Sequence, residues 1–153
     1  MKVLCICHAN ICRSFMAQEF LKQLLPGVEV FSRGLYADAA YEVPEKVLQA
    51  LADRKIVFNG HTSTQLTAQD LAQADLIFCM EQAHEERLVD RYPQYSNKLW
   101  LLTDFAFDKP QDLQDPIGLT GRTFEKQAAR LYEACVRAAQ RIRQEFLISP
   151  KGA

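Results

Sequence analysis

Two side chains near the start of the chain have the types and the spacing needed to attack a phosphoryl group. Cys7 and Arg13 stand in a Cys-x5-Arg pattern that is followed at once by Ser14. A cysteine reacts as its thiolate, which forms more readily beside a cation or a helix N-terminus. The guanidinium of Arg13 can hold two oxygens of a tetrahedral dianion. The pattern predicts in-line attack by Cys7 on a phosphate ester, giving a cysteinyl-phosphate that water then hydrolyses.

The elements around these side chains favour anion binding. Residues 3–6 form a short apolar run with a β-branched residue at each end, which predicts a buried strand. From Ser14 onward, large apolar side chains recur at helical spacing until residues 25–27, where Pro and Gly end the segment. A strand, a tight loop and a helix N-terminus can present several backbone N–H groups to one phosphate.

This stretch has three other interpretations, which are core packing, a metal site and a nucleotide phosphate loop. Cys7 alone is compatible with core packing, because free cysteine is often buried. A metal site is disfavoured, since Cys5, Cys7, His8 and Cys12 lack a C-x2-C pair and Arg13 would repel the cation. A nucleotide phosphate loop is disfavoured because the G-x4-G-K-[ST] pattern is missing. We therefore expect no metal and no cofactor.

Composition limits the class of protein. The 153 residues include 18 basic and 19 acidic side chains, so neither a nucleic-acid partner nor a membrane surface is favoured. No apolar run approaches the roughly 20 residues of a membrane span. We expect one domain over residues 1–148, a flexible tail over 149–153, and a cytoplasmic location in which the five cysteines stay reduced.

The order of the expected elements predicts an α/β fold. Further strands are expected at 28–32, 75–80 and 98–102, and further helices at 44–54, 67–72, 81–92 and 121–146. Alternating strands and helices predict a single-domain, four-stranded parallel sheet with helices on both faces. Ligands bind such sheets at the carboxyl ends of the strands. The acidic residues 103–119 are expected to form a long loop that reaches the Cys7 loop from that edge.

The stretch Cys7-His8-Ala9-Asn10-Ile11-Cys12-Arg13-Ser14, followed by Phe15-Met16-Ala17, resembles the signature of the low-molecular-weight protein tyrosine phosphatases, C-x-G-N-x-C-R-S-P-M-A. It departs from that signature at Ala9 and Phe15. The resemblance implies the fold of that family and hydrolysis of phosphotyrosine in proteins. It also implies phosphoprotein substrates, among them bacterial tyrosine kinases, and inorganic phosphate at the site.

Asp115 is the candidate proton donor. Pro116 restricts Asp115 to an extended conformation, and the family carries its acid in an Asp-Pro pair in a late loop. By this resemblance Asp115 protonates the leaving group and later activates water. Ile117 follows where the family usually has Tyr, so one aromatic wall of a phosphotyrosine site is missing. Read without the resemblance, Asp-Pro is simply a common turn.

The resemblance also implies supporting residues. Asn10 would hold an unusual loop backbone, Ser14 would donate to the sulfur, and Ser32 and His61 would form a polar network behind the loop. Cys12 would form a disulfide with Cys7 on oxidation. The residues expected to contact substrate are His8, Ala9, Asn10, Ile11, Cys12, Arg13, Ser14 and Ile117. The other cysteines, Cys5, Cys79 and Cys135, are expected in the core.

Alternative functions remain open at this point. An arsenate reductase of the same fold would need closely spaced extra cysteines, which Cys79 does not have. A phosphoarginine phosphatase would carry Thr at the Ile11 position, so Ile11 favours phosphotyrosine. The third alternative is a phosphotyrosine-binding module with weak turnover, suggested by Ala9, Phe15 and Ile117.

Overall fold

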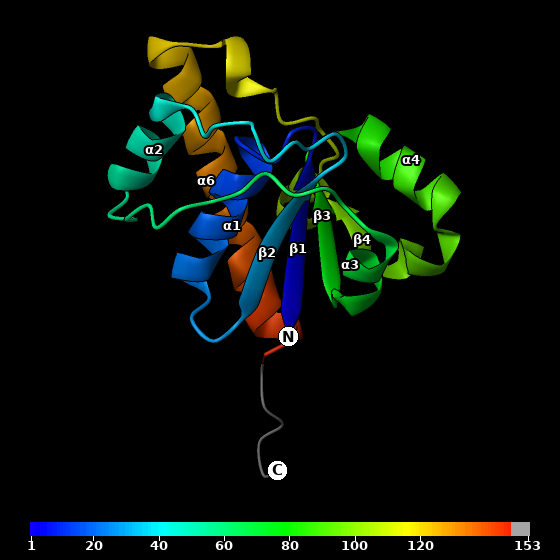
Figure 1. The fold of residues 1–153 in the computed structure, drawn as a ribbon. Coiled ribbons are helices and arrows are strands. Elements are labelled where there is room, and N and C mark those ends of the chain that lie inside the picture. The colour runs from blue at the N-terminus through cyan, green and yellow to red at the C-terminus, as the bar shows by residue number, and fades with distance from the viewer. Residues whose placement is uncertain (148–153) are drawn as a thin grey trace.

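The computed structural model describes residues 1–147 as a parallel sheet between two layers of helices (Figure 1). Four strands lie in the order β2-β1-β3-β4, and every neighbouring pair is parallel. They are β1 (Lys2–Cys7), β2 (Glu29–Gly34), β3 (Leu76–Cys79) and β4 (Leu99–Leu101). The predicted four-stranded parallel sheet is confirmed. The expected tail, 149–153, lies outside the described residues.

Helices connect the strands. The α-helices are α1 (Arg13–Leu24), α2 (Glu45–Ala52), α3 (Ala68–Gln73), α4 (Gln82–Arg91), α5 (Leu102–Phe107) and α6 (Gly121–Glu145). Two 3-10 turns are η1 (Pro93–Lys98) and η2 (Pro116–Gly118). The predicted start of α3 is confirmed by a capping box, in which Thr67 and Asp70 exchange side-chain to backbone hydrogen bonds. Within residues 1–147, no helix is both long enough and apolar enough to span a bilayer.

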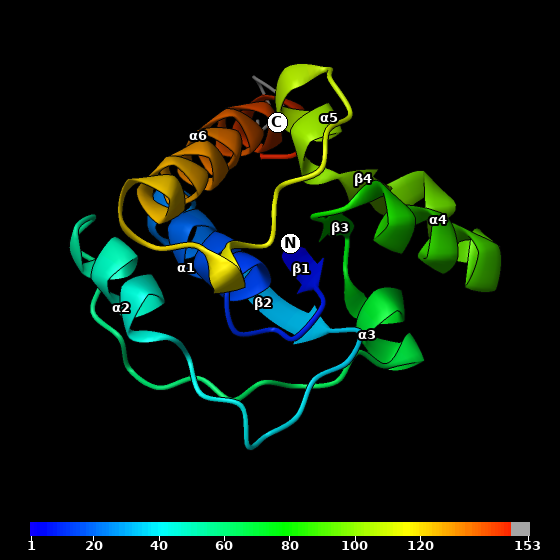
Figure 2. The same ribbon diagram turned by 90° about the horizontal axis from the view of Figure 1, so that it is seen from above.

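The sheet is covered on both faces, as Figure 2 shows from above. Val3 and Cys5 of β1 point into the core shared with α1 and α6, while Leu4 and Ile6 point toward α3 and α4. All four side chains are fully buried, which explains the uninterrupted apolar run. The predicted core positions of Cys5, Cys79 and Cys135 are confirmed, and burial raises the pKa of each thiol.

The prediction of one continuous loop over residues 103–119 is wrong in its first part. Residues 102–107 form α5, whose Leu102 and Phe105 are buried, and this helix ends at Asp108 in a left-handed conformation with φ 55°. The carbonyl of Phe105 accepts a hydrogen bond from Arg141 of α6. The sequence does not predict this helix, because it has fewer than two turns and its apolar face is too short to show a helical period. Acidic and proline residues on either side favour a loop instead.

Gly34, at the end of β2, lets the chain pass directly against the Cys7 loop (residues 7–13). The two residues after Gly34, Leu35 and Tyr36, donate backbone hydrogen bonds to the carbonyls of Cys7 and His8. A Cβ atom on Gly34 would lie 2.9 Å from the carbonyl oxygen of His8 and 3.1 Å from the backbone of Ala9. The close approach therefore requires glycine.

Replacing Gly34 by alanine is expected to destabilise the protein by about 1–3 kcal/mol, because the added methyl group must displace backbone. Gly118→Ala is the matched control, since a Cβ atom there would meet nothing within 4 Å. Urea unfolding of both variants measures the difference. Equal stability of the Gly34→Ala and Gly118→Ala proteins would contradict the steric account.

Candidate active site

A small pocket lies at the carboxyl end of β1, where the Cys7 loop meets the segment around Asp115. Its volume is about 20 Å³. It is lined by Cys7, His8, Ala9, Ile11, Cys12, Arg13, Asp115 and Ile117. Every predicted substrate-contacting residue except Asn10 and Ser14 lines this pocket, and those two lie directly behind it. The long-range expectation that the late acidic segment reaches the Cys7 loop is confirmed.

The sulfur of Cys7 is surrounded by hydrogen-bond donors. Ser14 Oγ lies 3.0 Å from Cys7 Sγ, and the backbone N–H of Asn10 donates to the same sulfur at 3.3 Å. Asn10 Nδ2 donates to Ser14 Oγ at 2.9 Å, which leaves the Ser14 hydroxyl proton available for the sulfur. Two donors aimed at one sulfur can stabilise negative charge on it.

Asn10 holds the loop through its side chain. Its φ of 62° places it in the left-handed region, as expected for an asparagine in a tight loop. Nδ2 donates to both Ser14 Oγ and Ser32 Oγ at 2.9 Å, and Oδ1 accepts from the backbone N–H of Thr64 at 2.9 Å. The fully buried amide thus connects α1, β2 and the segment before α3.

His61 and Ser63 support the backbone of the loop from outside. His61 Nε2 lies 2.7 Å from the carbonyl oxygen of Asn10, and Ser63 Oγ donates to the carbonyl of Ala9 at 2.7 Å. Half-buried His61 also stacks on Phe15, with ring centroids 4.1 Å apart. Phe15 is itself buried, so its ring packs inside the fold and holds His61 in place.

Arg13 is almost completely buried and connects three elements. Nη1 lies 3.1 Å from Glu81 Oε1 and donates to the carbonyl of Leu113 at 2.8 Å, while Nη2 lies 3.6 Å from Asp115 Oδ2. Glu81 in turn contacts His84 Nε2 at 2.9 Å through its other oxygen. These partners fix the plane of the guanidinium, which is the group that would hold the phosphate.

Sequence reasoning missed Glu81 and His84. Glu81 follows β3 directly, so the rule that ligands meet the carboxyl ends of strands could have identified it. No comparable signal marks His84, which reaches Glu81 from the first turn of α4. Burial lowers the pKa of His84, although the Glu81 carboxylate acts in the opposite direction. His84 Nδ1 is buried and has no hydrogen-bond partner within the described chain.

Asp115 lies at the rim of the pocket with its side chain 44% exposed. Its extended backbone, with φ −65° and ψ 116°, has the conformation expected before Pro116. Oδ1 accepts from the backbone N–H of Ile117 at 3.1 Å, which leaves Oδ2 turned toward Arg13. The carboxyl group is therefore near the Cys7 loop and open to solvent, as a proton donor to a departing oxygen must be.

The departures from the expected signature have structural explanations. Ala9 is not among the non-glycine residues with positive φ in the described chain, which are Asn10, Lys55 and Asp108. Its methyl group therefore causes no backbone strain. Ile117 is 51% exposed at the pocket rim. The exposed ring of His8, which also lines the pocket, lies 4.9 Å from that of Tyr36, an exposed aromatic residue that sequence reasoning also missed.

Cys12 lies in the pocket wall and behaves differently from a nucleophile. Burial, together with the charges of Cys7 and Asp115, raises its pKa to about 12. Cys12 is thus a neutral thiol within the Cys7 loop. Within residues 1–147, no group of three or more His, Cys, Asp or Glu side chains is placed to hold a metal ion.

A buried thiol within an anion-sized loop, with arginine beside it and a carboxyl group at the rim, is typical of phosphatases that use a cysteine nucleophile. A family model described as low molecular weight phosphotyrosine protein phosphatase matches residues 2–147. The chain therefore belongs to this family.

Named relatives act on two kinds of phosphoprotein. The probable low molecular weight protein-tyrosine-phosphatase EpsP of Ralstonia nicotianae is 33% identical over 124 residues, covering 81% of this chain and 83% of EpsP. A protein-arginine-phosphatase of Geobacillus stearothermophilus is 32% identical over 118 residues, which cover 76% of this chain and 79% of that protein. The crystal structure of the tyrosine phosphatase Wzb from Escherichia coli K30 in complex with sulphate matches with a TM-score of 0.83 and 27% identity. The match covers 92% of this chain and 97% of Wzb.

Stability is expected to fall as the pH drops from 7.5 to 5.5. Burial lowers the pKa of His61 below its ordinary value of 6.5, and it lowers that of His84 as well. The unfolded chain therefore binds more protons than the folded one in this range, and acid favours unfolding. Urea unfolding at both pH values measures the loss.

The His61→Gln variant places an amide near the position of Nε2, where it can donate to the carbonyl of Asn10, but this amide cannot be protonated. It is expected to lose less stability between the two pH values than the natural protein. If its loss equals that of the natural protein, titration of His61 does not contribute.

Proposed function

We propose that the protein is a cysteine-dependent phosphatase that hydrolyses phosphotyrosine in proteins through a cysteinyl-phosphate. The observation that carries this proposal is the position of the Cys7 sulfur, which has Ser14 at 3.0 Å and shares one pocket with Arg13 and Asp115. A nucleophile, a cation for the phosphate and an acid for the leaving group are then within reach of one phosphorus atom.

The first half of the reaction transfers the phosphoryl group to sulfur. Arg13 and the backbone N–H groups of the loop hold the equatorial oxygens, and the Cys7 thiolate attacks phosphorus in line with the leaving oxygen. The S–P bond forms as the P–O bond to the tyrosine breaks. Asp115 gives its proton to the departing phenoxide, so tyrosine leaves neutral.

The second half regenerates the enzyme. The Asp115 carboxylate takes a proton from water as that water attacks the phosphorus of the cysteinyl-phosphate. The S–P bond breaks, inorganic phosphate forms, and the thiolate is stabilised by donation from Ser14 and from the Asn10 backbone. No step requires a metal or an organic cofactor.

The rim residues set the choice of substrate. His8 and Tyr36 would face the phosphotyrosine ring on one side and Ile117 on the other, so an aromatic pair replaces the missing wall at Ile117. Ile11 lines the pocket as an aliphatic side chain and favours the uncharged phenol over the guanidinium of phosphoarginine. The substrate-contacting residues proposed are those that line the pocket, together with Asn10 and Ser14.

A phosphoarginine substrate is the second candidate. It is favoured by the resemblance to a protein-arginine-phosphatase at 32% identity and by the absence of an aromatic residue at Ile117. Steady-state kinetics on phosphotyrosine and phosphoarginine versions of one peptide separate the two. We expect the phosphotyrosine peptide to have the higher kcat/KM, and a preference for phosphoarginine would reverse the assignment.

The cellular setting is part of the same proposal. A phosphatase with five buried thiols suits a reducing compartment, which favours the cytoplasm. Its substrates would be tyrosine-phosphorylated proteins, with bacterial tyrosine kinases among them. We propose residues 1–148 as one functional domain.

Two substitutions test the mechanism. Cys7→Ser is expected to abolish turnover of an aryl phosphate, because a hydroxyl group in this loop is a far weaker nucleophile. Asp115→Asn is expected to lower kcat/KM about 100-fold, because the leaving group then departs as an anion. Wild-type turnover by the Cys7→Ser protein would rule out the mechanism. A natural protein that binds phosphotyrosine peptide without hydrolysing it would instead identify a binding module.

Cys12 is proposed as the redox partner of Cys7. Peroxide oxidises a thiolate to sulfenic acid, and a neighbouring thiol can displace water from that group to form a disulfide. After peroxide treatment, mass spectrometry of the natural protein is expected to show Cys7 linked to Cys12, with activity restored by reductant. Irreversible sulfonic acid at Cys7, without a linked peptide, would exclude this role.

A further inference from the structure

The ammonium group of Lys46 binds three carbonyl groups of the segment that follows Asp115. Nζ donates to the carbonyl oxygens of Pro116 at 2.9 Å, Ile117 at 2.6 Å and Leu119 at 2.6 Å. Lys46 lies in the first turn of α2, about 70 residues away along the chain. An ammonium has three donors, and all three are used here on one short turn.

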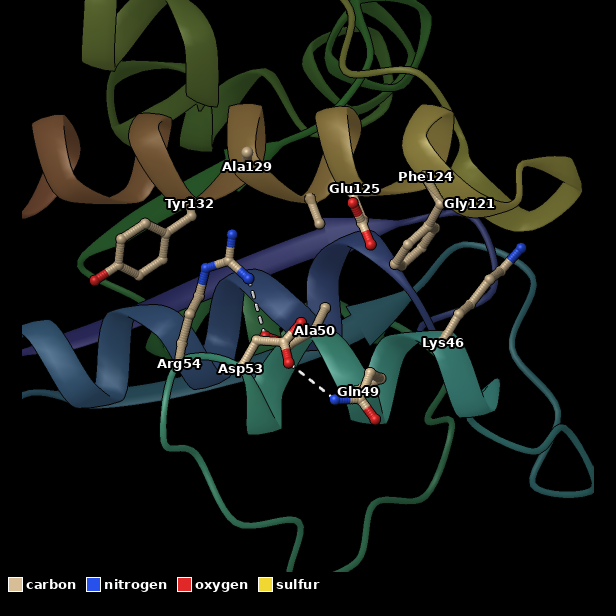
Figure 3. Close-up of a pocket in the computed structure, with 11 residues that line it drawn as sticks. Lys46, Gln49, Ala50, Asp53, Arg54, Gly121, Phe124, Glu125, Ala129 and Tyr132 are labelled. Atoms are coloured by element: carbon tan, nitrogen blue, oxygen red, sulfur yellow. Dashed lines mark hydrogen bonds between the residues drawn. The ribbon is translucent and has the colours of Figure 1, made fainter.

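The contact between Lys46 and this turn does not result from close packing of α2 on α6, because a groove separates the two helices. A groove of about 600 Å³ lies between the two helices, and Lys46 and Phe124 line one end of it (Figure 3). The Lys46 ammonium lies 5.3 Å from the centre of the Phe124 ring, so its charge also rests on an aromatic face. Figure 3 shows Arg54 and Tyr132 at the opposite end of the groove.

The segment before Asp115 is held by different partners. The backbone N–H of Leu113 donates to the carbonyl of Met80 at 2.9 Å, and its carbonyl accepts from Arg13. Asp112 accepts from the backbone N–H of Gln82 at 2.8 Å. The sheet edge thus fixes the chain before Asp115.

After Asp115 the pattern of contacts changes. Within residues 1–147, the hydrogen bonds that join η2 and Leu119 to another part of the fold are the three from Lys46. Ile117 is exposed and donates its N–H to Asp115 Oδ1, so movement of η2 would carry the carboxyl group with it. The orientation of Asp115 therefore depends on the position of η2.

We propose that Lys46 is a positioning residue for the general acid: by holding η2 it aims the carboxyl group of Asp115 at the leaving-group oxygen. This proposal rests on the proposed phosphatase function. Lys46 does not line the Cys7 pocket, so its proposed effect on proton transfer passes through Asp115. An acid displaced by about 1 Å transfers its proton poorly, and that loss matters most when the leaving group is a strong base.

The test compares Lys46→Met with the natural protein on two aryl phosphates, phenyl phosphate and 4-nitrophenyl phosphate. Phenoxide is the more basic leaving group and depends more on the proton from Asp115. The value of kcat/KM reports phosphoryl transfer to Cys7, since it covers the steps through the departure of the alcohol. We expect Lys46→Met to lower kcat/KM about tenfold on phenyl phosphate and clearly less on 4-nitrophenyl phosphate.

Three further variants isolate the cause. Lys46→Arg keeps a cation with several donors and is expected to recover most of the loss. Lys109→Met removes one positive charge from an exposed residue of the same acidic stretch, where Lys109 makes no hydrogen bond or ion pair within the described chain, and should leave both rates unchanged. In an Asp115→Asn background, Lys46→Met should change kcat/KM by less than about twofold, because there is no acid left to aim.

A structural readout accompanies the kinetics. Amide hydrogen exchange over residues 117–119 is expected to be faster in Lys46→Met than in Lys109→Met, while exchange in β1 stays the same. Urea unfolding establishes that each variant is folded under the assay conditions.

The outcomes are distinct. Equal losses on both substrates, or the same loss with and without Asp115, would show that Lys46 acts on the fold as a whole and would overturn the proposal. Unchanged kinetics in Lys46→Met would also overturn the proposal about Lys46. If Cys7→Ser is inactive in that case, the phosphatase function still stands. Turnover that does not depend on Cys7 would instead overturn the proposed function itself.

Discussion

The Cys7 loop depends on the side chain of Asn10. A left-handed backbone costs an ordinary residue roughly 1–2 kcal/mol, and asparagine tolerates it because its amide can bond locally. Here the amide donates to Ser14 and Ser32 and accepts from Thr64, so α1, β2 and the segment before α3 all hold one buried group. The N–H of Asn10 then faces the sulfur. The loop is thereby shaped before any phosphate arrives, and little reorganisation accompanies binding.

Arg13 joins this loop to the acid. Its guanidinium contacts Glu81 after β3, the carbonyl of Leu113 and the carboxylate of Asp115. The cation and the acid of the proposed mechanism are therefore held by one connected set of contacts. Interactions of this kind are stronger inside the protein than in water, because Arg13 is almost fully removed from solvent. Lys46 completes the set from the far side of Asp115.

The proposed determinants of substrate preference are a different group of residues. The side chains of Ile117, His8 and Tyr36 are exposed at the rim and make none of the hydrogen bonds that shape the loop. The rim can therefore vary without altering the chemistry at Cys7. This separation agrees with the two kinds of named relative, tyrosine phosphatases and arginine phosphatases, that share the fold.

Local sequence determined the features whose causes lie within one or two elements. The strand, loop and helix that place Cys7 and Arg13 follow from an apolar run and helical spacing, and the capping box of α3 from Thr67 and Asp70. The parallel sheet and the approach of Asp115 were also predictable, because parallel strands expose their carboxyl ends along one edge.

Only the tertiary structure decided the contacts between distant segments. Glu81 on Arg13, Tyr36 beside His8 and Lys46 on η2 depend on where side chains point once the sheet has formed, and no local period encodes that direction. Helix α5 was hidden for a related reason, since six residues stabilised by packing on α6 leave too short a pattern to recognise. The sequence alone thus identified the residues proposed to react, and the fold decided which side chains hold them.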